Sequence, residues 1–224
     1  MLMNDKEINN YKNCKIIIIG DSNVGKSNFF LRITKKTFNE NYKQSIEIEQ
    51  EKILQSFKDH QGFTKKILID LFDTFGQERY RNLINNYYKN VDGIIFIYDV
   101  TNKNSFDNIK NWFENVIKNN TNEKCKFAVI GNKVDLKDEI IIKNEDAIKI
   151  IDEYKEQYKI NDLIFNEISC KENLNVEETF QNLCKIIYND KKQNDNNKNE
   201  NEKIQINNLE HYKKKKKKMK CIIY

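Results

Sequence analysis

The stretch Gly20-Asp21-Ser22-Asn23-Val24-Gly25-Lys26-Ser27 decides the fold of this chain. The short run of Ile residues within 15–19 predicts a buried strand before it, and residues 29–33 predict a helix after it. A strand, a G-x-x-x-x-G-K-S loop and a helix form a phosphate-binding loop, whose backbone N–H groups surround an anion at a helix N-terminus. Lys26 then reaches the terminal phosphates, and the Ser27 hydroxyl can ligate Mg²⁺. A chance turn rich in Gly and Ser is disfavoured by the flanking context. The loop alone does not identify the nucleotide.

The composition bounds the chain to one globular domain with a charged tail. Its 224 residues include enough apolar side chains for one core. The formal net charge is +5, yet Lys213–Lys218 and Lys220 alone carry seven positive charges. The rest of the chain is therefore net acidic, and no nucleic-acid partner is expected.

The cysteines and the apolar runs indicate a cytoplasmic setting. The five cysteines lack the spacing of a metal site or a disulfide framework, so reduced thiols are expected. The N-terminus lacks the apolar segment of a signal peptide, and no apolar run approaches the ~20 residues that span a bilayer.

Strand-like and helix-like segments alternate between residues 15 and 188. Such alternation predicts an α/β fold with a parallel sheet, helices on both faces and a ligand at the carboxyl ends of the strands. The helix expected at 104–118 would be capped by Asn104 or Ser105. Strands are expected at 15–19, 46–49 with 52–57, 66–72, 93–98, 126–130 and 163–168, and helices at 29–33, 104–118, 145–158 and 176–188.

The composition changes along the chain predict four parts. They are a polar arm at 1–13, the globular domain at 14–188, a linker with the lysine block at 189–220, and a C-terminal tetrapeptide at 221–224. The linker is rich in Asn, Lys, Asp and Glu with almost nothing to bury, so disorder is expected there.

Further polar signals follow the 66–72 strand. Asp73-Thr74-Phe75-Gly76-Gln77 begins where that strand ends. A carboxylate at Asp73 can hold Mg²⁺ through water, the Gly76 N–H can sense a γ-phosphate, and Gln77 can orient water.

Two later strand ends carry signals for a base. Gly131-Asn132-Lys133-Val134-Asp135 follows the 126–130 strand, and Ser169-Cys170-Lys171 follows the 163–168 strand. A carboxylate that accepts from a ring N–H and an exocyclic amine selects guanine, because adenine lacks that pair of donors. Backbone N–H groups after the last strand can meet a base oxygen. Each signal alone is more often a turn or a cap, but their order and context make coincidence improbable.

Together these motifs resemble the small GTPases of the Ras superfamily, and most of all the Rab family, over residues 13–188. The resemblance implies a P-loop GTPase fold, in which a mostly parallel six-stranded sheet has one antiparallel edge strand and helices on both faces. It is carried by Gly20–Ser27, Ser45, Asp73-Thr74 with Gly76–Tyr80, Tyr87-Tyr88-Lys89, Tyr98–Thr101, Gly131–Lys133 with Asp135, and Ser169 with Lys171.

The resemblance implies that GTP or GDP binds with Mg²⁺. Gln77 would be the catalytic residue that positions the attacking water, and hydrolysis would be slow without an activating protein. Ser27, Ser45 and Asp73 would hold the metal. The nucleotide contacts would come from Ser22, Asn23, Val24, Gly25, Lys26, Ser27, Asn28, Phe38, Ser45, Gly76, Asn132, Lys133, Asp135, Ser169, Cys170 and Lys171.

The resemblance also implies partners. The loops within residues 38–50 and 73–88 would be switches, ordered by the γ-phosphate and released after hydrolysis. A guanine-nucleotide exchange factor, a GTPase-activating protein and effectors would bind there to a monomeric protein. The implied role is a GTP/GDP-cycling switch that recruits effectors in vesicle and membrane trafficking.

Several residues depart from the family pattern. Phe75 stands where the family nearly always has Ala, which leaves harmless outward packing, altered kinetics or loss of GTP-induced closure; altered kinetics are favoured. Asn23 replaces a Gly of Rabs, and Asn is among the least costly substitutes if the position needs φ > 0. Ser45 replaces Thr, Glu47 replaces Gly, and the region at 138–142 looks longer than usual. The alternative function is therefore a divergent GTP-binding adaptor with little or no hydrolysis.

The C-terminus resembles a prenylation signal. Cys221-Ile222-Ile223-Tyr224 has the C-a-a-X form, although Tyr lies outside the usual final residues. One lipid anchors only marginally, and Lys213–Lys220 could add about 1 kcal/mol per lysine near an anionic membrane. A solvated tail and a nuclear-import or RNA-binding patch are the alternatives. Peripheral attachment to the cytosolic face of an endomembrane or the plasma membrane is expected.

Overall fold

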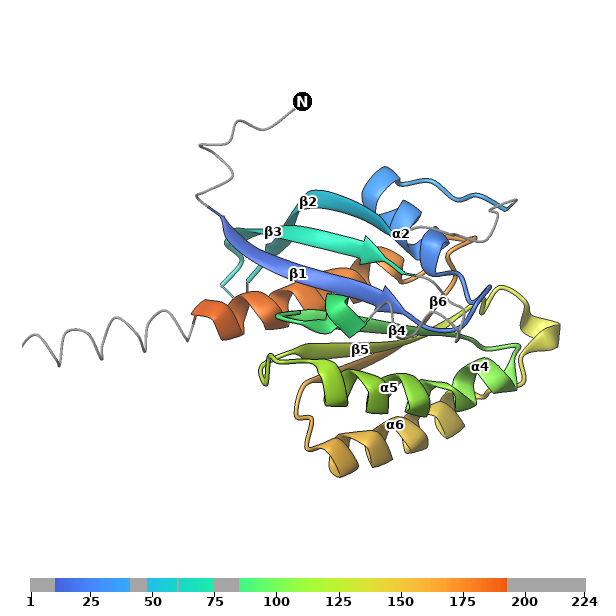
Figure 1. The fold of residues 1–224 in the computed structure, drawn as a ribbon. Helices are drawn as coiled ribbons and strands as arrows, with labels where there is room; N and C mark the ends of the chain where they lie inside the picture. Colours follow the sequence, from blue (N-terminus) through green and yellow to red (C-terminus); the bar gives the residue numbers. More distant parts are fainter. Residues whose placement is uncertain (1–10, 41–47, 60, 75–84, 193–224) are drawn as a thin grey trace, which may run out of the picture. The chain divides into compact units, whose positions relative to one another are not determined.

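The computed structural model describes residues 11–40, 48–59, 61–74 and 85–192 (Figure 1). Its contacts divide the chain into Met1–Ile187 and Tyr188–Tyr224. Of the second unit, only residues 188–192 are described, as the end of a helix. The predictions for Ser45, Phe75 and the prenylation of Cys221 lie outside the described residues, as do those for Gly76 and Gln77.

Six strands form one sheet in the order β2-β3-β1-β4-β5-β6. β2 runs antiparallel to β3, and every other neighbouring pair is parallel. This confirms the expected α/β fold with one antiparallel edge strand. The strands are β1 (Lys12–Ile19), β2 (Glu49–Lys58), β3 (Thr64–Asp73), β4 (Gly93–Asp99), β5 (Lys126–Asn132) and β6 (Leu163–Ile168).

The order of the strands positions the ligand site. After β1 the chain forms β2 and β3 on one side of β1, and it then continues to β4 on the other side, so the strand order reverses at β1. Open parallel sheets bind ligands outside the carboxyl ends of the strands at such a switch point. The loop at residues 20–25 follows β1 and therefore lies at this point of the sheet.

Helices cover both faces of the sheet, as expected (Figure 1). They are α2 (Lys26–Lys35), α4 (Lys103–Asp107), α5 (Ile109–Asn119), α6 (Asn144–Tyr158) and a helix at residues 176–192; η2 (Asn85–Tyr88) and η3 (Lys137–Glu139) are short 3₁₀ helices.

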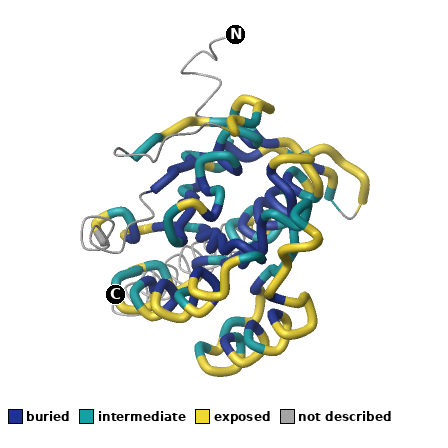
Figure 2. Tube along the Cα trace, turned by 90° about the vertical axis from the view of Figure 1, so that its right-hand side faces the viewer, coloured by how far each residue is buried: buried dark blue, intermediate teal, exposed yellow. Residues whose placement is uncertain are grey.

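Successive side chains of β1 contribute to the core on opposite faces of the sheet. Ile17 and Ile19 join a buried cluster with Trp112 and Phe113 of α5, whereas the neighbouring Ile16 faces the other side, near Ile187. Successive strand residues point to opposite faces, and helices on both sides therefore leave β1 no exposed face. Figure 2 shows the buried strands at the centre of the described residues. Burial of each such Ile side chain contributes roughly 1.5–3 kcal/mol.

The prediction of one continuous helix at 104–118, capped by Asn104 or Ser105, was wrong in both respects. Asn102 is the N-cap: its φ is −132°, and its side chain accepts from the N–H groups of Asn104 and Ser105. The helical segment is divided at Asn108, which separates α4 from α5. Asn and Ser are both favourable N-cap residues, so the local sequence does not distinguish Asn102 from Asn104 and Ser105.

Two element ends differ from the expected boundaries of the parts. β1 begins at Lys12, inside the stretch expected as an arm, and pairs there with Ile67 of β3. The last helix continues to residue 192, into the stretch expected as linker.

Candidate functional site

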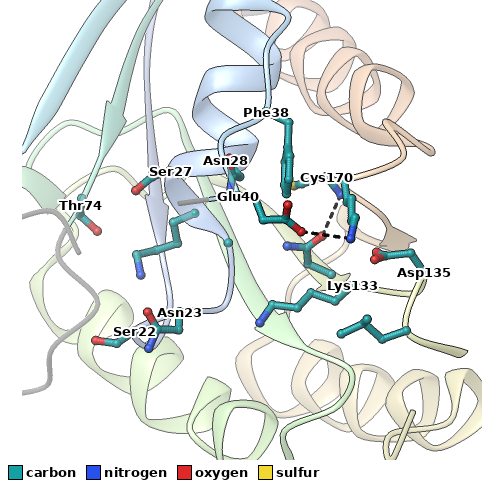
Figure 3. A pocket seen from close by; sticks show the side chains of 15 residues that line it. Ser22, Asn23, Ser27, Asn28, Phe38, Glu40, Thr74, Lys133, Asp135 and Cys170 are labelled. Atoms are coloured by element: carbon teal, nitrogen blue, oxygen red, sulfur yellow. Dashed lines mark hydrogen bonds and ion pairs between the residues drawn. The ribbon is translucent and has the colours of Figure 1, made fainter. Parts of the chain in front are cut away.

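A cavity of about 360 Å³ lies at the carboxyl ends of the central strands. Figure 3 shows Ser22, Asn23 and Ser27 at one end and Phe38, Cys170 and Asp135 at the other. Of the predicted nucleotide contacts, those that line it are Ser22, Asn23, Gly25, Lys26, Ser27, Asn28, Phe38, Asn132, Lys133, Asp135, Cys170 and Lys171.

Three other predicted site residues that the structure describes lie outside the lining of the cavity. Val24, Asp73 and Ser169 are buried and do not line the cavity. Sequence reasoning did not assign three lining residues, Glu40, Thr74 and Leu136. Thr74 could have been suspected, because it directly follows Asp73 at a strand end.

The backbone of the loop requires its special residues. Asn23 has a φ of 63°, so Asn does occupy a left-handed position, where it is among the less costly residues. Gly25 has a φ of 101° and precedes the first residue of α2. A Cβ at Gly25 would overlap the side-chain nitrogen of Asn132, so only Gly fits there.

Within the described residues, the side chain of Lys26 bonds a backbone carbonyl and no carboxylate. Its Nζ donates to the backbone carbonyl of Asp21 at 2.6 Å, within a buried environment. Burial lowers the pKa of Lys26 to about 8, whereas the charges of Asp73 and Asp21 act in the opposite direction. An anionic ligand would compensate the lost hydration and favour the ammonium form. A bound phosphate would therefore stabilise the charged form of Lys26.

Ser27 and Asp73 form the second polar pair of the site. The Ser27 hydroxyl donates to Oδ2 of Asp73. Burial raises the pKa of Asp73 to about 6, although the Ser27 bond and the charge of Lys26 lower it. Within the described part of the chain, Oδ1 of Asp73 is buried without a hydrogen-bond partner. Because Mg²⁺ prefers hard oxygen ligands, this orphaned oxygen beside a hydroxyl fits such an ion.

Asn132 joins the two ends of the cavity. Its Nδ2 donates to the carbonyl of Val24 at 2.8 Å, and its Oδ1 accepts from the N–H of Cys170 at 3.0 Å. The side chain is buried, so both backbone groups depend on it. Asn132 therefore fixes the phosphate loop and the loop after β6 relative to one another.

Asp135 and Lys133 are each held by a neighbour. Oδ1 of Asp135 accepts from the Ser169 hydroxyl at 2.6 Å. The Nζ of Lys133 lies 2.6 Å from Oδ2 of Asp99, whose Oδ1 accepts from the N–H and hydroxyl of Thr101. The sequence motif contains Asp99, but no local pattern predicts its contact with Lys133.

Asp21 connects the loop to α5 and was not among the predicted site residues. Its carboxylate accepts from Nε1 of Trp112 at 2.8 Å and from Nδ2 of Asn108 at 2.6 Å. These partners are 91 and 87 residues away in the sequence. No local pattern could have indicated them.

A cavity that joins the loop after β1 to the loops after β5 and β6 defines a P-loop nucleotide-binding domain. The chain belongs to the Ras family, whose sequence model matches residues 15–189. Within it, the chain is a Rab-like small GTPase. It is 37% identical over 174 residues to "Ras-related protein Rab-1" of Theileria annulata, covering 77% of this chain and 73% of that protein. It is 36% identical over 183 residues to human "Ras-related protein Rab-8B", covering 81% of this chain and 82% of that protein.

A third relative agrees with this assignment. "Ras-related protein Rab-13" of Canis lupus familiaris is 36% identical over 177 residues, covering 77% of this chain and 79% of that protein. Membership of the family carries GTP/GDP binding and GTPase activity. In the portion of the chain that the structure describes, no helix combines the length and apolarity needed to cross a bilayer.

Proposed function

We propose that this GTPase is a Mg²⁺-dependent switch that recruits effectors during membrane trafficking. The observation that carries the proposal is the single cavity that joins Lys26 and Ser27 of the phosphate loop to Asp135 and Cys170 at its other end. A nucleotide has the same division into an anionic part and a base with polar edges.

The phosphate end binds the charge of the nucleotide. Lys26 contacts the β- and γ-phosphates. Among the described residues, no carboxylate hydrogen bond competes for its buried ammonium group. Ser27 and Asp73, together with Ser45, hold Mg²⁺, which supplies charge neutralisation at the phosphates. Gln77 positions the attacking water, as the resemblance implies. The orphaned Oδ1 of Asp73 supports the metal assignment.

The base end reads guanine. Ser169 occupies one oxygen of Asp135 and so fixes the carboxylate in orientation. Asp135 then accepts from the ring N–H and the exocyclic amine of guanine. Phe38, which lines the cavity, packs against the base. Asn132 holds the two loops together, and Lys133 lies along the nucleotide.

The switches and the tail connect the nucleotide state to partners. Residues 38–50 and 73–88 bind the exchange factor, the activating protein and effectors, and Phe75 alters the kinetics of exchange or hydrolysis. Lys213–Lys220 and a prenylated Cys221 attach the protein to an anionic membrane. A prenyl mass shift on the cellular protein supports the attachment, and its absence contradicts it.

Single-turnover GTP hydrolysis tests the switch. We expect Gln77→Leu to hydrolyse GTP more slowly than the wild type while retaining GDP affinity. Equal rates for both would instead support the non-hydrolysing adaptor. For the metal, chelation with EDTA should accelerate GDP release from the wild type and have little effect on Ser27→Ala. Equal acceleration of both proteins would remove Ser27 from the metal site.

A further inference from the structure

Arg32 lies in the last turn of α2, away from the phosphate chemistry, yet it contacts the base end of the cavity. Its Nε donates to the carbonyl of Cys170 at 2.7 Å, and its Nη2 donates to the carbonyl of Lys171 at 2.8 Å. The guanidinium carbon also lies 5.5 Å from the ring centroid of Phe38. One side chain therefore contacts both the loop after β6 and the aromatic ring of the cavity.

The two carbonyl contacts fix the direction of a backbone donor. A peptide unit is planar and trans, so the carbonyl of Cys170 and the N–H of Lys171 point in opposite directions. When Arg32 binds that carbonyl, it turns the N–H of Lys171 away from itself. Because Lys171 lines the cavity, an N–H that is turned away from Arg32 can meet a ligand bound there.

The neighbouring N–H groups of the loop are already used. Ser169 donates to the carbonyl of Leu174, Cys170 donates to Oδ1 of Asn132, and Glu172 donates to the hydroxyl of Ser169. The hydrogen bonds of the described residues include no partner for the N–H of Lys171, which lies between these used donors. A ligand with a hydrogen-bond acceptor beside Lys171 would satisfy this backbone donor.

We propose that Arg32 is a positioning residue for base recognition: it aims the N–H of Lys171 at the exocyclic oxygen of guanine and supports the ring of Phe38. The proposal rests on the proposed function, in which Asp135 reads the other edge of the base. Arginine suits this role because its planar fork can serve two carbonyls at once. A lysine is a point donor on a flexible stem and cannot reproduce both contacts together.

The test separates the two edges of the base. Affinities of the full chain for GDP, IDP and ADP are measured by competition with radiolabelled GDP. GDP and IDP differ only by the exocyclic amine that Asp135 reads. IDP and ADP differ at the exocyclic group assigned to Lys171 and also at the ring N–H assigned to Asp135, so the GDP-over-IDP preference is the control for any effect at Asp135. In Arg32→Met the preference for IDP over ADP should fall about two- to tenfold, the range expected for one hydrogen bond. The preference for GDP over IDP should stay unchanged.

A matched control lies on the same helix. Lys35 is the other basic residue in the last turn of α2 and is exposed, so Lys35→Gln removes the same charge near the same helix end. We expect wild-type ratios from Lys35→Gln and an intermediate loss from Arg32→Lys. Thermal melting reports folding of each variant, and Arg32→Lys decides the matter if Arg32→Met does not fold.

Three outcomes would overturn the proposal. Arg32→Met could weaken all three nucleotides in equal proportion, which indicates support of the fold only. It could lower the GDP-over-IDP preference instead, which places its effect at Asp135. A wild type without preference for GDP over ADP would overturn the proposed function itself, and that result is visible before any variant is made.

Discussion

Replacement of Gly25 by Ala should damage the site through one identified contact. Gly25 has a φ of 101°, and an added Cβ would overlap Nδ2 of Asn132. The Asn132 amide would have to move from the carbonyl of Val24 and the N–H of Cys170, which it bonds at 2.8 and 3.0 Å. Each buried backbone group left unpaired costs about 1–3 kcal/mol. The displaced amide should therefore lower the free energy of unfolding by about 2–6 kcal/mol.

Gly62 supplies the matched control for backbone strain. Its φ is 82°, and a Cβ there would meet nothing within 4 Å. A side chain in the left-handed region costs about 1–2 kcal/mol, and restriction of the unfolded chain returns about 0.4–1 kcal/mol. Gly62→Ala should therefore lower the free energy of unfolding by at most about 2 kcal/mol. The additional loss of unfolding free energy in Gly25→Ala, relative to Gly62→Ala, measures the effect of the contact with Asn132.

Urea unfolding of the nucleotide-free protein measures these effects, and a double-mutant cycle assigns them. In an Asn132→Ala background the overlap is gone, so Gly25→Ala should cost no more than Gly62→Ala. A coupling between Gly25 and Asn132 below about 0.5 kcal/mol, the usual scatter of independent sites, would refute the reasoning. Equal costs of Gly25→Ala and Gly62→Ala in the wild-type background would refute it as well.

Three further predictions concern the cavity. Asp135→Ala should abolish the preference for GTP over ATP in competition binding; an unchanged preference would contradict its role at the base. Glu40 lies 3.2 Å from Lys171 across the cavity mouth, so Glu40→Gln should accelerate GDP release about two- to fivefold at low salt, the range of an exposed ion pair. Lys103→Gln, which breaks an exposed pair elsewhere, should leave the release rate unchanged. The pKa of Asp73 is raised from 3.8 in the unfolded chain to about 6 in the folded, metal-free protein. The resulting contribution to stability is fully present below pH 3.8 and is lost as the pH rises through about 6. Asp73→Asn should flatten that part of the pH profile of the urea midpoint.

The sequence predicted those parts of the fold that depend on local pattern. The apolar run of β1 was predicted as a strand, and the loop that follows it lines the cavity, because periodicity and glycine spacing are visible along the chain. The base-end motifs after β5 and β6 reached the same cavity, because parallel strands bring their carboxyl ends together.

The parts that could not be predicted depend on distant contacts. Arg32 meets Cys170 across 138 residues, and Asp21 meets Trp112 across 91. Only the folded sheet brings these side chains together. The cap of α4 was missed for another reason: Asn102 competes with two nearby residues that cap equally well in isolation.

The bond between Trp112 and Asp21 has a practical consequence. Trp112 is the only tryptophan of the chain, and it is fully buried. Its indole N–H donates directly to a carboxylate of the phosphate loop. Indole emission depends on such a hydrogen bond, so the unlabelled protein has an intrinsic optical reporter at the loop that no second indole obscures. Stopped-flow emission spectroscopy could then follow occupancy of the loop in real time, without an attached dye.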